Sequence, residues 1–281
     1  MGTSLNTASL NTLQLERDGH VGRLILNRPN KLNCFTIEMW RELRELGQSL
    51  VADPGDLRAL IVIGAGRAFS SGIDTSVFAG GEPDGIAGGS DAGTRHANPL
   101  VDGIMATQEA FSWLEDAPFA TIAAARGFAL GAGLQIALAC DIRIFARGIS
   151  VGLLEHKYGI IPDLGGTQRL PRIVGPGKAK EMIFTAARID GDEAHRIGLC
   201  EQLVADEELE TAAHKLAVRI AGQPPLAIRE AKRAINVSFD LPMAEGLRAE
   251  AEGQGVCLPS NDMREAITAF IEQRDPTYRG E

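Results

Sequence analysis

The chain lacks the features of a membrane-spanning or disulfide-stabilised protein. It has no run of about 18 or more apolar residues, so we expect no transmembrane helix. Four cysteines are scattered among its 281 residues and form no Cys-x-x-Cys pair, which excludes the usual zinc spacings and favours reduced thiols. The polar stretch 1–12 lacks the basic and apolar regions of a signal peptide. We therefore expect a cytoplasmic location and no membrane partner.

Basic charge is also in short supply. The chain has 28 Lys and Arg against 37 Asp and Glu, a net charge of −9 at pH 7. This balance argues against nucleic acid or an anionic membrane surface as the main partner. A small anionic ligand still fits, because a local cluster of Arg and Lys can oppose the overall sign. Hydrophobic residues at 44 % and charged residues at 23 % are typical of a globular protein.

Short apolar runs alternate with helical patterns along the first two hundred residues. Two strands are expected within 13–26, and a helix follows Thr36, which is a good N-cap. The runs 57–63, 120–125 and 140–146 are almost wholly apolar, as in strands buried on both faces. This alternation predicts an α/β core with crossover connections.

Two later segments depart from this pattern. Residues 79–99 hold six glycines and two prolines, and predict either a lid over a substrate pocket or a surface insertion without fixed structure. From residue 206 onward four amphipathic helices are expected, at 207–220, 225–237, 243–254 and 261–274. We divide the chain into a core, 1–205, and a helical region, 206–281, that packs on the core or on another subunit.

Two glycine-containing segments are suited to binding through the backbone. Residues 70–74, Ser-Ser-Gly-Ile-Asp, follow a buried strand, where α/β sheets bind ligands. Residues 127–135 lead into a helix start, whose unpaired N–H groups favour negative charge. A dinucleotide fingerprint would need Gly or Ala where Ile136 stands, so we set a Rossmann enzyme aside.

Two carboxylates lie in apolar sequence surroundings. Glu155 follows an apolar run, and Asp163 lies eight residues later among Ile, Pro, Leu and Gly. Such surroundings raise the pKa of a carboxyl and make it a usable acid or base near neutral pH. Either could instead be a helix cap or a salt-bridge partner, and His156 is expected to face solvent.

Together these segments resemble the crotonase superfamily, the enoyl-CoA hydratase/isomerase family. The resemblance covers nearly the whole chain, from Leu24 to Phe270, and is carried by residues 24–33, 69–74, 123–133, 140–143 and 165–171. It implies a spiral core of right-handed ββα turns followed by a helical trimerisation region, hence a homotrimer or a dimer of trimers. It also implies an acyl-CoA thioester as substrate, with no metal and no cofactor beyond the coenzyme A of that substrate.

The resemblance also implies how the site works. Members of the family stabilise a thioester enolate with two backbone N–H groups, which fall here on Ile73 and Ala132; an oxyanion needs such fixed donors. The implied substrate-binding residues around them are Ser71, Gly72, Asp74, Gly131 and Gln135. Candidates for contact with the CoA phosphates are Arg28, Lys31, Arg67 and, from a neighbouring helix, Arg274.

Departures from the family pattern bear on the reaction. Its hydratases use two glutamates; Glu155 matches the second, but the first falls on Gln135, which cannot take a proton from water. Asp163 stands where dienoyl-CoA isomerases carry an Asp, although it could simply shape its loop. We therefore expect an isomerase of an enoyl- or 3,5-dienoyl-CoA, with Glu155 and Asp163 as catalytic residues. Alternatives are a hydratase in which Gln135 holds water, and an acyl-CoA-binding protein without turnover.

Overall fold

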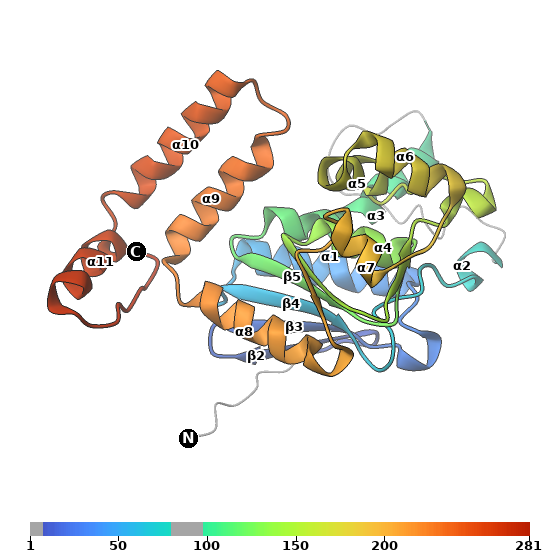
Figure 1. Ribbon diagram of the computed structural model, residues 1–281, viewed down its shortest axis with the longest axis horizontal. Coiled ribbons are helices and arrows are strands. Elements are labelled where there is room, and N and C mark those ends of the chain that lie inside the picture. Colours follow the sequence, from blue (N-terminus) through green and yellow to red (C-terminus); the bar gives the residue numbers. More distant parts are fainter. Residues whose placement is uncertain (1–7, 80–97) are drawn as a thin grey trace.

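The structure, a computed structural model, describes residues 8–79 and 98–281, and its centre is a seven-stranded sheet (Figure 1). Nearly all of the glycine-rich segment 79–99, predicted to be either a lid or a surface insertion, lies outside the described residues. The strand order is β1-β2-β3-β4-β5-β7-β10, with bounds Ala8–Ser9, Leu13–Asp18, Val21–Leu26, Ala59–Gly64, Ala120–Ala125, Ile142–Ala146 and Gln202–Val204. The first three strands pair antiparallel, and β3 through β10 pair parallel.

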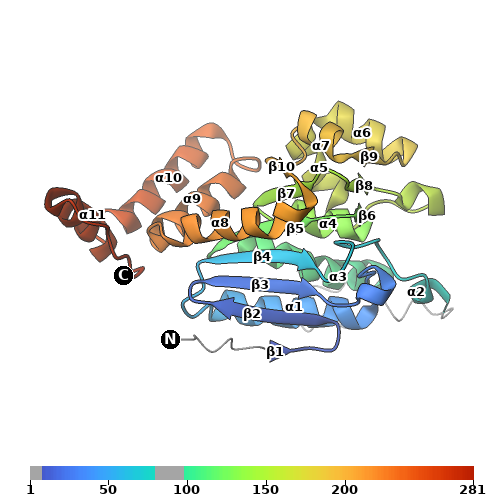
Figure 2. The same cartoon turned by 60° about the horizontal axis from the view of Figure 1, so that its bottom comes forward.

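The parallel strands are buried on both faces, as their apolar runs predict. In β4, Leu60 and Val62 belong to one core cluster and Ile61 and Ile63 to the other. The first cluster packs against α1 (Ile37–Ala52), α3 (Pro99–Asp116) and α4 (Ala132–Ala139). The second is covered by α8 (Leu209–Ala221), which runs across the opposite face of the sheet (Figure 2). The predicted α/β layering is therefore confirmed.

Local sequence signals fix the long helices. The Thr36 side chain accepts a hydrogen bond from the Met39 N–H at 3.3 Å and so caps α1, as predicted. Within α1, a Cβ on Gly47 would lie 2.2 Å from the Trp113 ring of α3. Glycine at this position therefore lets α1 and α3 pack closely beneath the sheet.

A second group of short elements was not predicted. A three-stranded sheet joins β6 (Phe128–Leu130), β8 (Ser150–Gly152) and β9 (Ile189–Asp190). Further short helices are η1 (Pro29–Lys31), α2 (Ser76–Ala79), η3 (Glu155–Tyr158), α5 (Gly166–Val174), α6 (Pro176–Thr185), α7 (Gly191–Arg196) and η4 (Asp206–Glu208). The small sheet matters for the site because β6 leads into α4 and β8 leads toward η3.

The C-terminal helices project away from the sheet (Figure 1). They are α9 (Pro225–Val237), α10 (Met243–Cys257) and α11 (Asn261–Glu272), and we call residues 225–281 the C-terminal arm. The predicted boundary at 206 also included α8, but α8 buries Leu209, Ala213 and Ala217 in the second core cluster and is part of the core. Among the described helices, none is long and apolar enough to cross a membrane.

A buried lysine ties the arm to the core. Lys232 of α9 donates to the carbonyls of Leu114 at 2.7 Å and Phe119 at 3.1 Å, and its Nζ lies 2.9 Å from Oδ2 of Asp141. That same carboxylate oxygen accepts from the Thr121 N–H at 2.7 Å. The base of the arm is thereby held against the ends of α3 and α4.

Candidate active site

Two backbone segments, far apart in sequence, lie against each other at the start of α4. Ser70 pairs with Ala129 in a parallel bridge: its N–H donates to Phe128 at 2.8 Å, and its carbonyl accepts from Leu130 at 3.1 Å. A Cβ on Gly133 would lie 2.6 Å from the Ser70 carbonyl oxygen. Only glycine permits this approach, which brings residues 70–74 against the first turn of α4.

This arrangement leaves the two predicted N–H groups unused. The Phe35 N–H donates to the Gly72 carbonyl at 2.8 Å and the Asp74 N–H donates to Phe35 at 2.9 Å, so the Ile73 N–H faces away from Phe35. Ala132 is the first residue of α4, where an N–H has no intrahelical acceptor. Within residues 8–79 and 98–281, neither N–H donates a hydrogen bond to the protein. The two segments thus have the donors that an oxyanion needs.

Glu155 lies beside these segments. It is only 5 % exposed, and a Cβ on Gly131 would lie 3.3 Å from its Oε1. That Oε1 accepts a hydrogen bond from Nε2 of Gln135 at 2.8 Å, while Oε2 is buried with no partner in the described part of the chain. Burial raises the pKa of Glu155 to about 7, against the opposing effect of the Gln135 hydrogen bond. The carboxyl can therefore both accept and donate a proton near neutral pH.

Gln135 is fixed at both ends of its side-chain amide. It is 1 % exposed on α4, and its Oε1 accepts from the Gly166 N–H at 2.9 Å while its Nε2 donates to Glu155. The sequence reasoning missed Gly166; only its place in a glycine pair before a helix could have indicated it. The Gly166 N–H and the glutamine together orient Glu155 and leave Oε2 as its free oxygen.

The structure also brings Asp163 into the neighbourhood of Glu155. The negative charge of Asp163 contributes to the raised pKa of Glu155, and burial raises the pKa of Asp163 itself. The backbone carbonyl of Asp163 accepts from Nε2 of Gln108 at 2.6 Å, which ties this loop to α3. Proton transfer by the Asp163 carboxyl stays a prediction, and shaping of its loop stays the alternative.

The basic residues predicted to meet CoA phosphates have different surroundings. Arg28 forms an ion pair with Asp74, with Nη2 and Oδ2 3.0 Å apart. Lys31 and Arg67 are exposed. Arg274 follows α11 and pairs with two glutamates of the arm. Figure 1 shows that α11 lies far from α4 of the same chain. Their contacts with phosphate stay predictions, whereas His156 faces solvent as predicted.

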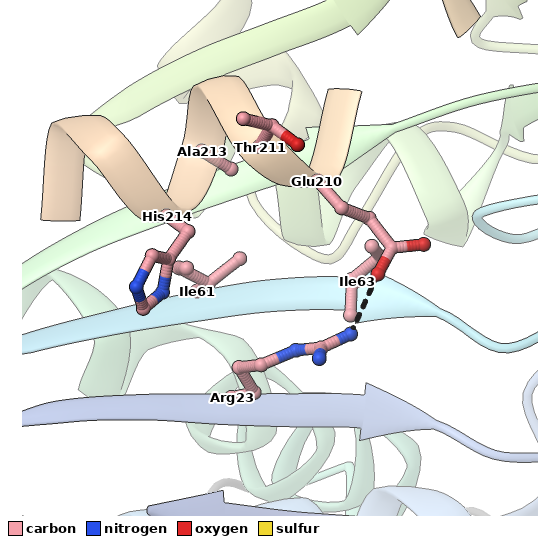
Figure 3. A pocket seen from close by; sticks show the side chains of 7 residues that line it. All are labelled: Arg23, Ile61, Ile63, Glu210, Thr211, Ala213 and His214. Carbon is pink, nitrogen blue, oxygen red and sulfur yellow. Dashed lines mark hydrogen bonds and ion pairs between the residues drawn. The ribbon is translucent and has the colours of Figure 1, made fainter. Parts of the chain in front are cut away.

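A separate cavity of about 270 Å³ opens between α8 and the strands β3 and β4 (Figure 3). Its floor is apolar, and Arg23 and Glu210 pair at 2.9 Å across it. None of the predicted site residues lines this cavity, which lies on the α8 face of the sheet.

The structure thus combines a layered α/β core with a buried carboxyl whose pKa is raised to about 7, beside two backbone N–H groups that have no acceptor among the described residues. The family model described as "Enoyl-CoA hydratase/isomerase" matches residues 16–281, and the chain belongs to this family. The resemblance drawn from the motifs is thereby confirmed.

Related proteins cover nearly the whole chain. The short-chain-enoyl-CoA hydratase of Clostridium acetobutylicum is 38 % identical over 94 % of this chain and 96 % of its own length. An enoyl-CoA hydratase of Bacillus anthracis matches in structure with a TM-score of 0.86 at 34 % identity, over 96 % of this chain and 100 % of that one. A putative enoyl-CoA hydratase of Thermobifida fusca, solved in complex with acetoacetyl-CoA, matches with a TM-score of 0.78 at 37 % identity, over 88 % and 95 %. These matches confirm the predicted crotonase-type fold.

Proposed function

We propose that the protein is an acyl-CoA isomerase that shifts the double bond of an enoyl- or 3,5-dienoyl-CoA thioester, with Glu155 as the proton shuttle. The observation that carries this proposal is the state of Glu155. Its Oε2 is buried and has no partner among residues 8–79 and 98–281, and its pKa is raised to about 7. The position of the family's other glutamate is occupied by Gln135, which donates to Glu155.

The proposed reaction begins with binding of the thioester oxygen to the N–H groups of Ile73 and Ala132. These donors stabilise negative charge on that oxygen, so a proton can leave C2 of the acyl chain. Oε2 of Glu155 takes this proton and returns it to C4 of a 3-enoyl chain, which moves the double bond into conjugation. In a 3,5-dienoyl chain the remote carbon is C6, and Asp163 is the second carboxyl that could protonate it.

We also propose that the substrate binds as a CoA thioester. The Thermobifida fusca relative was solved with acetoacetyl-CoA, which supports a CoA thioester as the ligand of this chain as well. All the steps use protein groups and the substrate, so the proposed enzyme needs no metal and no further cofactor. Ser71, Gly72, Asp74 and Gly131 shape the backbone around the thioester.

Hydration of a 2-enoyl-CoA is the second candidate, and the names of relatives favour it: several are called enoyl- or crotonyl-CoA hydratases. In this chain, however, the amide of Gln135 donates to Glu155 and accepts from Gly166, and an amide takes no proton from water. Glu155 would have to activate the water and protonate the carbon alone.

A panel of 2-enoyl-, 3-enoyl- and 3,5-dienoyl-CoA thioesters separates these functions. We expect the 3-enoyl or 3,5-dienoyl substrates to be isomerised with kcat of at least about 1 s⁻¹, and the 2-enoyl substrate to gain water far more slowly. Faster hydration than isomerisation would establish the hydratase instead. Tight binding of every thioester with no turnover would establish a binding protein.

A further inference from the structure

A single guanidinium connects the segment of Ile73 to a neighbouring loop. Nη2 of Arg28 donates to Oδ2 of Asp74 at 3.0 Å, and Nη1 donates to the backbone carbonyl of Cys34. Asp74 directly follows Ile73, and Phe35 directly follows Cys34 and pairs with Ile73. Arg28 therefore fastens the two strands of the bridge that directs the Ile73 N–H.

Asp74 is held from its other side as well. Its Oδ1 accepts from the N–H of Ser76 at 3.1 Å and from the hydroxyl at 2.8 Å, and Oδ2 also accepts from Sγ of Cys34 at 3.3 Å. The hydrogen bonds from Ser76, then that from Arg28, hold the pKa of Asp74 well below its usual range. The carboxylate thus stays charged and paired throughout the neutral range.

The loop that carries Arg28 is itself anchored to the core. The backbone N–H of Arg28 donates to Oδ1 of Asn33 at 2.8 Å. Nδ2 of Asn33 in turn donates to the carbonyls of Ala65 at 2.9 Å and Ala68 at 2.8 Å. Asn33 is fully buried. A rigid loop, a fixed guanidinium and a fixed carboxylate therefore form one continuous support for Ile73.

We propose that Arg28 and Asp74 are a positioning pair that aims the Ile73 N–H at the substrate's thioester oxygen. This rests on the proposed function only in taking that oxygen as the acceptor. Nη1 and Nη2 of Arg28 each donate a hydrogen bond within the protein, to Cys34 and to Asp74, so the proposed role of Arg28 is at the enolate end of the substrate. Contact with the CoA phosphates is the alternative that the test compares with it. A displaced donor stabilises an oxyanion poorly even when the substrate remains bound.

The test compares two probes that differ only in the phosphate-bearing part: acetoacetyl-CoA and the acetoacetyl thioester of pantetheine. Each probe is titrated into the protein, and the enolate absorbance at saturation and the Kd are recorded. For Arg28→Ala we expect about a tenfold lower enolate-to-keto ratio with both probes. If the variant instead weakens only the Kd of acetoacetyl-CoA and keeps the parental enolate ratio, Arg28 is a phosphate contact and the proposal is wrong.

Asp74→Asn is the second variant, since it keeps the size of the side chain and removes the charge that holds Arg28. It should lower the enolate ratio with both probes, and the double variant should lose little more than either single one. A parental ratio in Asp74→Asn would overturn the proposal even if Arg28→Ala failed to fold. Arg147→Ala is the matched control, because Arg147 pairs with Asp192 at the same 3.0 Å but on the exposed surface.

The readout also separates this proposal from the proposed function. Enolate formation by a bound acetoacetyl thioester does not depend on whether the natural reaction is isomerisation or hydration. If the substrate panel shows a hydratase and both variants lower the enolate ratio, the proposed isomerase function is wrong. The positioning role of Arg28 and Asp74 is then still supported.

Discussion

At the scale of single residues, the site depends on the carboxyl of Glu155, whose burial disfavours its charged form. Glu155 is buried, its Oε2 has no partner in the part of the chain that the structure describes, and the Gln135 side chain accepts a hydrogen bond from Gly166. Desolvation makes the proton of Glu155 harder to lose, which gives the carboxyl its pKa of about 7. Burial therefore suits Glu155 to proton transfer, but it also lowers the stability of the folded protein when this carboxyl is charged.

That cost gives a pH-dependent stability. The pKa of Glu155 is raised from 4.5 to about 7 on folding, so the folded protein holds this proton more tightly than the unfolded chain. The stabilising contribution is complete below about pH 4.5 and is lost as the pH rises through about 7. We expect Glu155→Gln to gain up to roughly 3 kcal/mol over the parent at pH 8 and less than about 1 kcal/mol at pH 5.

Urea unfolding at both pH values measures this difference, with Glu109→Gln on the exposed face of α3 as the control for the substitution itself. An equal loss of stability at both pH values would show that Glu155 is a structural hydrogen-bonding group.

Asp163 is the second residue to test, because its carboxyl has two open roles. If it donates the proton to the remote carbon, Asp163→Asn should slow 3,5-dienoyl turnover by about 10²–10⁴-fold. Exchange of the C2 proton with deuterated solvent should then survive, since Glu155 can still remove it. If Asp163 shapes its loop instead, both rates should fall together by a modest factor, with a lower Tm. Steady-state rates and mass-spectrometric exchange decide between these outcomes.

At the scale of elements, the oxyanion site depends on how closely α4 approaches residues 70–74. A Cβ on Gly133 would lie 2.6 Å from the Ser70 carbonyl oxygen, so Gly133→Ala must push α4 away and move the Ala132 N–H from that of Ile73. We expect kcat to fall by about 10²-fold and stability to fall by about 1–3 kcal/mol. Gly148→Ala is the control, because no atom of residues 8–79 and 98–281 lies within 4 Å of its Cβ position. A parental kcat in Gly133→Ala would contradict this account of the site.

The elements also show what the sequence could reveal. β5 matches its predicted bounds, 120–125, and α9 matches 225–237, because an unbroken apolar run and a regular amphipathic helix are local signals. The short strands β6, β8 and β9 were missed, since two or three residues hold too little pattern. Family motifs indicated Ile73, Ala132 and Glu155, whose segments the fold brings together and whose catalytic roles stay predictions. They could not reveal that Gly166 fixes Gln135 or that Arg28 pairs with Asp74, because these contacts depend on tertiary folding.

At the scale of the whole molecule, the C-terminal arm presents a large apolar surface in the single chain. Its exposed apolar residues include Ile235, Phe239, Leu247, Leu258, Ile267, Phe270 and Ile271. Surfaces of this kind are usually covered by another protein. We propose that other copies of the chain cover them, in a homotrimer or a dimer of trimers.

Light scattering on the full chain should therefore give a mass three or six times the 29.9 kDa of one chain. Removal of residues 225–281, which leaves α8 on the sheet, should give monomers or aggregates. Phe270→Glu is a gentler variant, since Phe270 is 85 % exposed and its substitution leaves the core intact. It should shift the assembly toward smaller species. A fully active monomer of the intact chain would contradict this assembly.

The central claim is that Glu155 alone carries the first proton transfer, next to the N–H groups of Ile73 and Ala132. The most direct test is the rate of 3-enoyl- or 3,5-dienoyl-CoA isomerisation by Glu155→Gln relative to the parent, with acetoacetyl-CoA binding measured on the same samples. We expect Glu155→Gln to lose about 10²–10⁴-fold in kcat with binding nearly unchanged, because the backbone donors remain. An unchanged rate in Glu155→Gln would contradict it.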